Sequence, residues 1–398
     1  MTETSSKSRI LSIDIMRGLT LFLMLFVNDL YVPGVPKWMV HTQAHEDGMG
    51  LADWVFPGFL FMVGMAIPFA FMSREKKGET TGKIIGHILV RTVSLLLIGV
   101  FMVNVHRLNP ELAVISQNVW AILVYLSVFL VWNKYPENSS YGKLFLGLKA
   151  LGVIGLGILA IIFRAGTAED PEWMATSWWG ILGLIGWGYF AASLTYLFTK
   201  GKLVPIVLTW MFFIALNMFS QWNMLGFLNP IRPVFGVLIS GNTPSIVLCG
   251  LVVGVLLKTY KSDFKKLQSI LIPMGIIVLS LGFVLRTWFI ISKIGGTPSW
   301  AMVCNGISIL LFCLLFFIID QRKWEKWSAI FKPAGQNSLT TYLAPDILYY
   351  MIWGLGLNIL FYKQDGSAVL AVVGSLVWAV AMIGFAALLS KINIKLKL

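Results

Sequence analysis

The chain has only four histidines in 398 residues, and two of them, His41 and His45, lie in one short polar segment. This segment, GVPKWMVHTQAHEDGMG, also carries Glu46 and Asp47 and comes directly before a long apolar run. Imidazole changes its charge near neutral pH, so a histidine here can accept and return a proton during a reaction. His41, His45 and Asp47 could also bind a metal, but no second group of ligands supports this. The segment is therefore a candidate site for acid–base or nucleophilic chemistry, with no metal expected; the alternative is that both histidines are ordinary loop residues.

The composition indicates which elements position these histidines. Hydrophobic residues make up 57% of the chain and charged residues 12%, and the mean hydropathy is +0.80. Apolar runs of roughly 20 residues, long enough to cross a bilayer, recur from end to end. Lipid offers the backbone no hydrogen-bond partners, so such runs form helices. We predict an all-α, polytopic transmembrane helical bundle of about 11–12 spans. The expected spans are 10–30, 52–72, 84–104, 112–132, 143–164, 176–198, 203–220, 244–258, 267–291, 298–319, 338–361 and 368–390.

The 31 lysines and arginines are distributed unevenly among the loops. Most lie in the alternate loops that include both chain ends, so the positive-inside rule predicts that both termini are cytoplasmic and that the histidine segment is extracytoplasmic. The net charge of +13 then reflects topology rather than nucleic-acid binding. No stretch resembles a separate soluble domain, so we expect residues 1–398 to form one multi-pass domain in a membrane, the bacterial inner (cytoplasmic) membrane being the expected location. Residues 222–240 could form a re-entrant or surface segment instead of part of a span.

The first span contains ionisable side chains. Asp14 and Arg17 are three positions apart, so they share a helix face and can pair. Arg17 and Asn28 are eleven positions apart, which at about 100° per residue returns to nearly the same face. The first helix is thus expected to carry a polar stripe; the alternative is an interfacial ion pair and an unrelated asparagine. In a later span Asp346 follows a proline, and such an interrupted helix is expected to line a cavity.

These residues fit two classes of protein. The sequence contains no P-loop, no dinucleotide-binding fingerprint and no serine nucleophile elbow. A transporter or flippase for a polar solute or glycolipid could use Asp14, Arg17 and Asp346 along its path. A membrane-embedded transferase could use the histidine segment as its active site.

Three stretches carry a resemblance to a known family: RILSIDIMRGLTLFLMLFVND, VHTQAHEDGMGLADWVFPGFLFMVGMAIP and GQNSLTTYL. They resemble the motifs of the heparan-α-glucosaminide N-acetyltransferase family and its bacterial relatives. The order of apolar runs is similar over most of the chain, while the motif matches lie near its two ends. The matching positions are Arg9, Ser12, Asp14, Arg17, Gly18, Val27, Asn28, Asp53, Val55, Phe56, Pro57, Phe59, Phe61, Gly64, Gly335, Asn337, Ser338 and Tyr342.

The resemblance implies an enzyme that takes an acetyl group from cytosolic acetyl-CoA and delivers it to an amino sugar or glycan across the membrane. By motif order it implies chemistry at Asn28 and at His41 or His45. His41 is favoured because His41-Thr42 resembles the family's pair of a histidine and a small residue. The chain has Ala344-Pro345-Asp346 where the animal enzymes carry Gly-His-Glu, so the natural acceptor stays open.

Acyl transfer from a thioester to an amine needs a base, and it benefits from hydrogen-bond donors to the oxyanion. The histidine could act as that base or as a nucleophile that carries the acyl group, and both routes stay open. Asn28 is a candidate oxyanion donor. The expected partners are acyl-CoA, the sugar acceptor and the lipid bilayer, a homo-oligomer is compatible with the sequence, and nucleic acid is not expected. The residues predicted to bind acetyl-CoA are Arg9, Asp14, Arg17, Lys332, Asn337 and Ser338.

Overall fold

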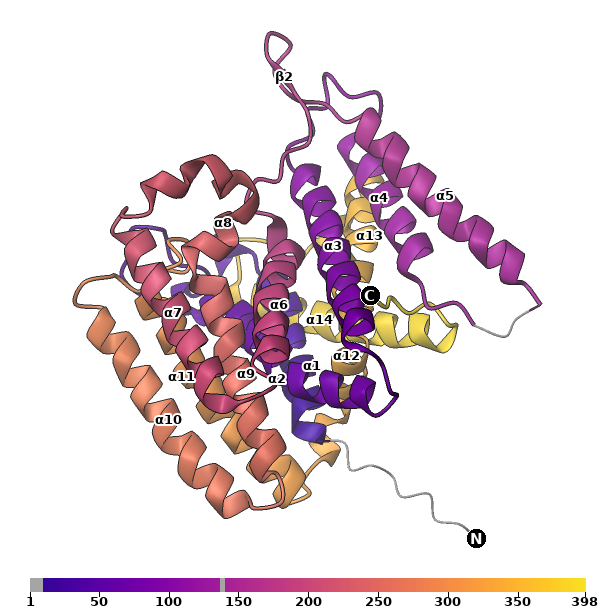
Figure 1. Ribbon diagram of the computed structural model, residues 1–398. Coiled ribbons are helices and arrows are strands. Elements are labelled where there is room, and N and C mark those ends of the chain that lie inside the picture. Colours follow the sequence, from indigo (N-terminus) through magenta and orange to yellow (C-terminus); the bar gives the residue numbers. More distant parts are fainter. Residues whose placement is uncertain (1–9, 137–139) are drawn as a thin grey trace.

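The structure, a computed structural model, describes residues 10–136 and 140–398 and is a bundle of helices (Figure 1). Its only strands in these residues, β1 (Ala165–Gly166) and β2 (Pro171–Glu172), form a small antiparallel hairpin. The long helices are α1 (Leu11–Asp29), α2 (Leu51–Glu75), α3 (Thr81–Val105), α4 (Gln117–Trp132), α5 (Gly142–Ile161), α6 (Gly180–Phe198), α7 (Leu203–Gln221), α9 (Asn242–Tyr260), α10 (Phe264–Leu285), α11 (Pro298–Leu315), α13 (Ser338–Gly354) and α14 (Ala368–Lys391). The short elements are η1 (Val32–Gly34), η2 (Lys37–Met39), η3 (Gly226–Ile231), α8 (Arg232–Ser240), η4 (Phe316–Gln321), η5 (Lys326–Ile330), α12 (Lys332–Gln336) and η6 (Asn358–Leu360).

The helices confirm the predicted fold class. Each expected span contains one long helix. In the described part of the chain, ten helical segments are long and apolar enough to cross a membrane by length and composition. The other two expected spans are α4, with 16 residues, and α13, with 17 residues. The protein is therefore an all-α, multi-pass membrane protein.

The segment 222–240, for which the sequence left two interpretations, forms η3 and the nine-residue helix α8. At about 1.5 Å per residue, a helix of this length is too short to cross a bilayer alone. It ends at Gly241, whose φ of 71° lies in the left-handed region, where glycine fits without the steric cost that a β-carbon brings. Helix α9 follows directly after this glycine.

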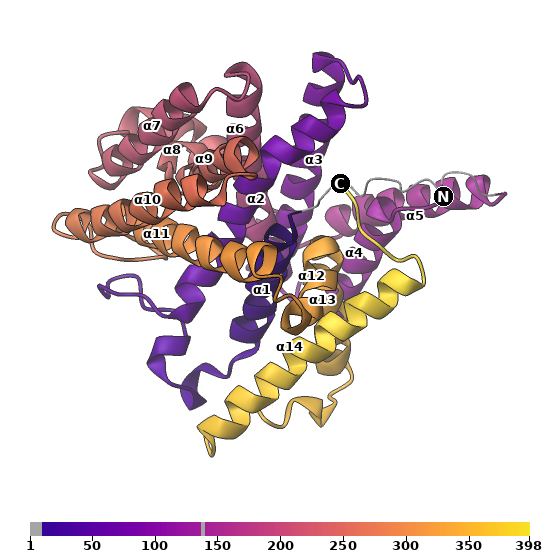
Figure 2. The ribbon, with the colours of Figure 1, turned by 90° about the horizontal axis from the view of Figure 1, so that it is seen from below.

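Helices α1 and α2 occupy the middle of the bundle, as two views at right angles show (Figures 1 and 2). Helices α7, α8 and α10 lie on one flank, and α4 and α5 lie on the other. The start of α1 is held from a distant part of the chain, because both carboxylate oxygens of Asp320 accept backbone N–H groups of α1, from Leu11 and Ser12, at 3.0 Å. These two N–H groups have no partner within their own helix, so the carboxylate stabilises the helix end.

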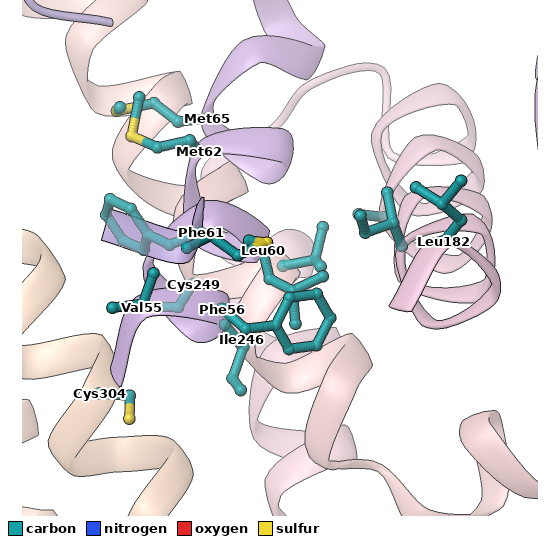
Figure 3. Packing of buried hydrophobic residues seen from close by; sticks show 14 of the residues in the cluster. Val55, Phe56, Leu60, Phe61, Met62, Met65, Leu182, Ile246, Cys249 and Cys304 are labelled. Carbon is teal, nitrogen blue, oxygen red and sulfur yellow. The ribbon is translucent and has the colours of Figure 1, made fainter. Parts of the chain in front are cut away.

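The core of the bundle is packed around α2. Phe61, Met62 and Met65 of this helix are fully buried, and Phe61 lies close to Cys249 of α9 (Figure 3). The two helices approach so closely that a β-carbon on Gly64 would lie 1.8 Å from the carbonyl oxygen of Val247. Small residues allow such backbone contact between membrane helices, where van der Waals packing drives association.

Replacing Gly64 with alanine should destabilise the bundle, because the added methyl group meets backbone atoms of α9 that cannot easily move. Overpacking of this kind typically costs about 1–3 kcal/mol, which should lower the melting temperature measured in detergent. Gly86→Ala is the matched control, since a β-carbon on this helical glycine meets nothing within 4 Å and alanine is the better helix former. Equal melting temperatures for Gly64→Ala and the unmodified protein would contradict this packing.

Candidate functional site

Asp53 and His41 form the centre of the candidate site. His41 lies in the loop between α1 and α2, and its Nδ1 is 2.7 Å from Oδ1 of Asp53 in the first turn of α2. The Asp53 side chain is fully buried, whereas 44% of the His41 side chain is exposed. Because a carboxylate accepts, the proton of a neutral His41 ring sits on Nδ1. The lone pair of Nε2 is then directed away from Asp53, as a general base requires.

The second oxygen of Asp53 holds the loop in place. Oδ2 accepts the N–H of Gly50 at 2.9 Å and both the N–H and the hydroxyl of Thr42 at 3.1 Å. The contact with Gly50 is half of a capping box at the start of α2. One carboxylate thus starts a helix, fixes the residue after His41 and orients the imidazole.

Lys293 completes the arrangement from another part of the chain. It lies in the loop between α10 and α11, with Nζ 3.1 Å from Nε2 and 3.2 Å from Nδ1 of His41. Burial lowers the pKa of Lys293 from its ordinary value, and the charge of Asp53 opposes part of that effect. An amine therefore lies close to both nitrogens of the His41 ring, within 3.1 Å of the one that does not face Asp53.

A clamp at Asp47 docks the histidine loop onto the segment that carries Lys293. The Asp47 carboxylate accepts the Ile291 N–H at 2.8 Å and Nε of Arg286 at 2.8 Å. The Gly48 N–H donates to the Ile291 carbonyl at 2.9 Å. The hydrogen bond from the Ile291 N–H has the largest effect and lowers the pKa of Asp47; burial opposes it, and Arg286 adds to the lowering. The clamp is therefore intact at neutral pH and weakens only as the pH falls below the ordinary aspartate value of 3.8.

Other residues predicted for the chemistry lie elsewhere. His45 is exposed, and in the described residues its side chain has no hydrogen bond. Asn28 is likewise exposed and without a side-chain hydrogen bond in the described part of the chain. At this end of α1 the next residue, Asp29, is buried instead. Its carboxylate accepts hydrogen bonds from the hydroxyls of Tyr349 and Tyr362 and pairs with Lys363 at 2.7 Å. No cluster of three or more His, Cys, Asp or Glu suited to a metal occurs in 10–136 and 140–398.

A cavity of about 390 Å³ lies deeper along α1 and α2. Arg17 of α1, Arg74 of α2, Arg91 of α3 and Lys397 of the C-terminal segment contribute positive charge to its wall. Most of the remaining wall is apolar, and Gln336, Asn337 and Ser338 add polar side chains to it. A cationic wall beside an apolar one suits an amphipathic anion.

Two of the predicted motifs meet at this cavity although they are far apart in sequence. A β-carbon on Gly18 would lie 2.0 Å from the carbonyl oxygen of Phe331, and one on Gly335 would lie 1.9 Å from that of Asp14. Glycine at both positions therefore lets α12 approach the backbone of α1. This contact brings Asn337 and Arg17 into the wall of the same cavity.

The structure brings together some of the residues that were predicted to bind acetyl-CoA. Arg17, Asn337 and Ser338 line the cavity, and Asp14 pairs with Arg17 at 2.6 Å, as the three-residue spacing predicted. Lys332 begins α12 but is not among the lining residues, and Arg9 lies outside the described residues. Asp346 is also not in the wall; its carboxylate interacts with the hydroxyl of Tyr125 on α4.

Several residues of the two places were not among the predicted site residues. Lys293 is one of the few basic residues in its set of loops, which was the only available signal. Arg91 stands out as a charge within a span, and it stacks on Tyr189 with the guanidinium carbon 4.7 Å from the ring centre. Lys397 reaches the cavity because its N–H donates to the Trp132 carbonyl at 2.9 Å, a contact that sequence alone does not reveal.

The histidine centre and the cavity share α2 but are separate places. Phe59 is the first residue of α2 in the cavity wall, six positions after Asp53, or about 9 Å along the helix axis. Buried side chains of Trp54, Val55 and Phe56 occupy the turns between them. Neither His41 nor Asp53 lines the cavity.

The fold and these two features define a multi-pass helical membrane protein with an Asp–His pair, whose carboxylate is buried, and a basic cavity. Residues 9–229 match the family described as "Domain of unknown function (DUF5009)", and the chain belongs to that family. It is also similar to the heparan-alpha-glucosaminide N-acetyltransferase of Mus musculus, with 31% identity over 148 residues, which are 35% of this chain and 22% of the relative. The protein of the same name from Homo sapiens is 35% identical over 96 residues, which are 24% of this chain and 14% of the relative.

These matches confirm the family relationship that the motifs predicted. The chain nevertheless spans less than a quarter of the length of either relative in these matches. What those relatives act on is therefore a basis for proposals about this protein.

Replacing Asp47 with alanine should loosen the histidine loop, because the Ile291 N–H and Arg286 lose their acceptor. Hydrogen–deuterium exchange should become faster in residues 41–50 and 286–293. Glu46→Ala is the matched control, since this carboxylate accepts the Gln43 N–H within the loop, at 3.0 Å. Unchanged exchange at the Ile291 amide in Asp47→Ala would show that the clamp does not hold the loop.

Proposed function

We propose that the protein is an integral-membrane acetyltransferase that moves an acetyl (acyl) group from acetyl-CoA to an amino sugar or glycan. The observation that carries the proposal is the Asp53–His41 pair, with a buried carboxylate 2.7 Å from Nδ1 and Nε2 left as the basic nitrogen. The names of the two relatives support the acetyl group and the amino sugar. The resemblance in the motifs supports acetyl-CoA as the donor.

His41 is the proposed base. As the acceptor amine attacks the thioester carbonyl, Nε2 takes the amine proton, and the thiolate of CoA leaves. The carboxylate of Asp53 holds the ring in orientation and stabilises the imidazolium that forms. Asn28 remains the proposed oxyanion donor from the motifs; because its side chain is exposed, it is free to meet a bound substrate.

The cavity is the proposed place for the donor. The phosphates of CoA carry negative charge that Arg17, Arg91 and Lys397 can neutralise. Asp14 pairs with the Arg17 side chain. The apolar wall suits the uncharged arm that ends in the thioester. Reaching His41 requires the thioester to pass the turns of α2 between Phe59 and Asp53.

The charge distribution supports an arrangement across the membrane. Arg74 lies in the last turn of α2 and Asp53 in its first turn, so the cavity's basic residues and His41 lie toward opposite ends of this helix. With both termini in the cytoplasm, the donor would enter from the cytoplasm and the acceptor would be modified on the other side. We propose one functional domain over residues 1–398, in the bacterial inner (cytoplasmic) membrane, with a homo-oligomer as a compatible state.

His41→Ala should reduce acetyl transfer by about 10²–10⁴-fold, the usual contribution of a positioned acid–base group. The measurement is transfer of radiolabel from acetyl-CoA to glucosamine by purified protein. His45→Ala is the matched control and should stay close to the unmodified rate, because this side chain is exposed and outside the Asp53 network. Loss of activity in His45→Ala but not in His41→Ala would move the base to His45. Uptake of a polar solute into vesicles without any transfer would favour a transporter.

Arg91→Ala should raise KM for acetyl-CoA with a smaller change in kcat, because the residue is proposed to bind the donor and not the reacting atoms. Loss of a charge-assisted hydrogen bond costs about 1.5–3 kcal/mol, or roughly tenfold to hundredfold in affinity. Arg164→Ala, an exposed arginine that donates to the Ile161 and Phe163 carbonyls outside the cavity, is the control. An unchanged KM in Arg91→Ala would place the donor elsewhere.

A further inference from the structure

An amine of the protein itself lies at the nitrogen that we propose as the base. Nζ of Lys293 is 3.1 Å from Nε2 of His41. Although Nζ is also 3.2 Å from Nδ1, the proton on Nδ1 is donated to Asp53. Nζ therefore lies within reach of both ring nitrogens, and Nε2 is the one that does not face Asp53. An amine acceptor must also come within hydrogen-bond reach of Nε2 when His41 takes its proton.

The surroundings of Lys293 favour its nucleophilic form. Burial lowers its pKa below the ordinary value of 10.5, against a partial opposing effect of Asp53. At neutral pH a larger fraction of this side chain is therefore free amine than in an exposed lysine. Lys37, which is exposed in the loop between α1 and α2, provides the comparison within the same chain.

We propose that Lys293 is an internal acetyl acceptor, so that the site acetylates itself when no amino sugar is bound. Nζ of Lys293 attacks the thioester carbonyl, the new bond is the amide of Nε-acetyllysine, and the bond that breaks is the C–S bond of the thioester. Nε2 of His41 takes the amine proton and passes it to the leaving thiolate, which departs as CoA. The step needs no further reactant, and it rests on the proposed function because it uses the same donor and base.

This modification would regulate the site. Acetylation removes the charge of Lys293 and places a bulkier neutral amide against Nε2, which fills the position of the acceptor amine. An amino sugar bound at His41 competes with Lys293 for the donor and protects the lysine. The activity of the site would then follow the supply of acceptor.

The test uses the purified full-length chain, isotopically labelled acetyl-CoA and no sugar, with acetylation of each lysine measured by peptide mass spectrometry. We expect labelling of Lys293 to exceed that of Lys37 by at least about tenfold, since a positioned general base contributes that much or more. His41→Gln should remove this excess, and added glucosamine should reduce it. Lys37→Arg is the matched control and should leave labelling of Lys293 unchanged, whereas Lys293→Arg should abolish labelling at that position.

A second arm separates this inference from the proposed function by using p-nitrophenyl acetate, a small donor that does not need the cavity. One outcome is that the ester labels Lys293 in a reaction that depends on His41, while acetyl-CoA does not label it. This outcome would support Lys293 as the acceptor and contradict acetyl-CoA as the donor. The inference would be overturned if Lys293 were labelled no more than Lys37 by either acetyl-CoA or the ester. If acetyl-CoA still acetylated glucosamine in that case, the proposed function would remain intact. The comparison of Lys293 with Lys37 is made within the unmodified chain, so it holds even where a variant fails to fold.

Discussion

The buried carboxylate of Asp53 is the constraint on which the site depends. A charge removed from solvent is costly unless hydrogen bonds and partners compensate it. Here the donors come from Gly50, from Thr42 and from His41, so the loop before α2 must turn back over the helix end. The backbone carbonyl of Asp53 also accepts Nε1 of Trp300 in α11 at 3.1 Å. One residue thereby joins the loop, α2 and α11 into a single rigid support for the imidazole.

The same requirement explains the polar ends of α1. Asp14 is buried and pairs with Arg17, and Asp29 is buried with Lys363 and two tyrosine hydroxyls as partners. Charges at membrane depth persist only when they are compensated in this way or face a cavity. Since Asp320 also holds the start of α1, this helix is anchored at both ends. Because both ends of α1 are held, the face of the helix that carries Arg17 stays directed toward the cavity.

Much of the fold could be predicted, because the pattern that defines it is local. Apolar runs of bilayer length specify helices wherever they occur, so each expected span contains one. The pair of Asp14 and Arg17 follows from helical spacing in the same way. The candidate site was predictable only in part. The motifs indicated Arg17, Asn337 and Ser338, and they favoured His41 over His45. The contact of His41 with Asp53 was not predicted and comes from the structure.

The sequence by itself determined that this is a helical membrane protein of the acetyltransferase-related family, because hydropathy, helical spacing and motif residues act over short stretches of chain. Only the tertiary structure decided which groups meet. Lys293 reaches His41 across 252 positions, and Gly335 meets the backbone of Asp14 through the packing of α12 on α1. Contacts of this kind depend on how whole helices pack and on which buried charges find partners, and no local pattern of residues encodes that choice.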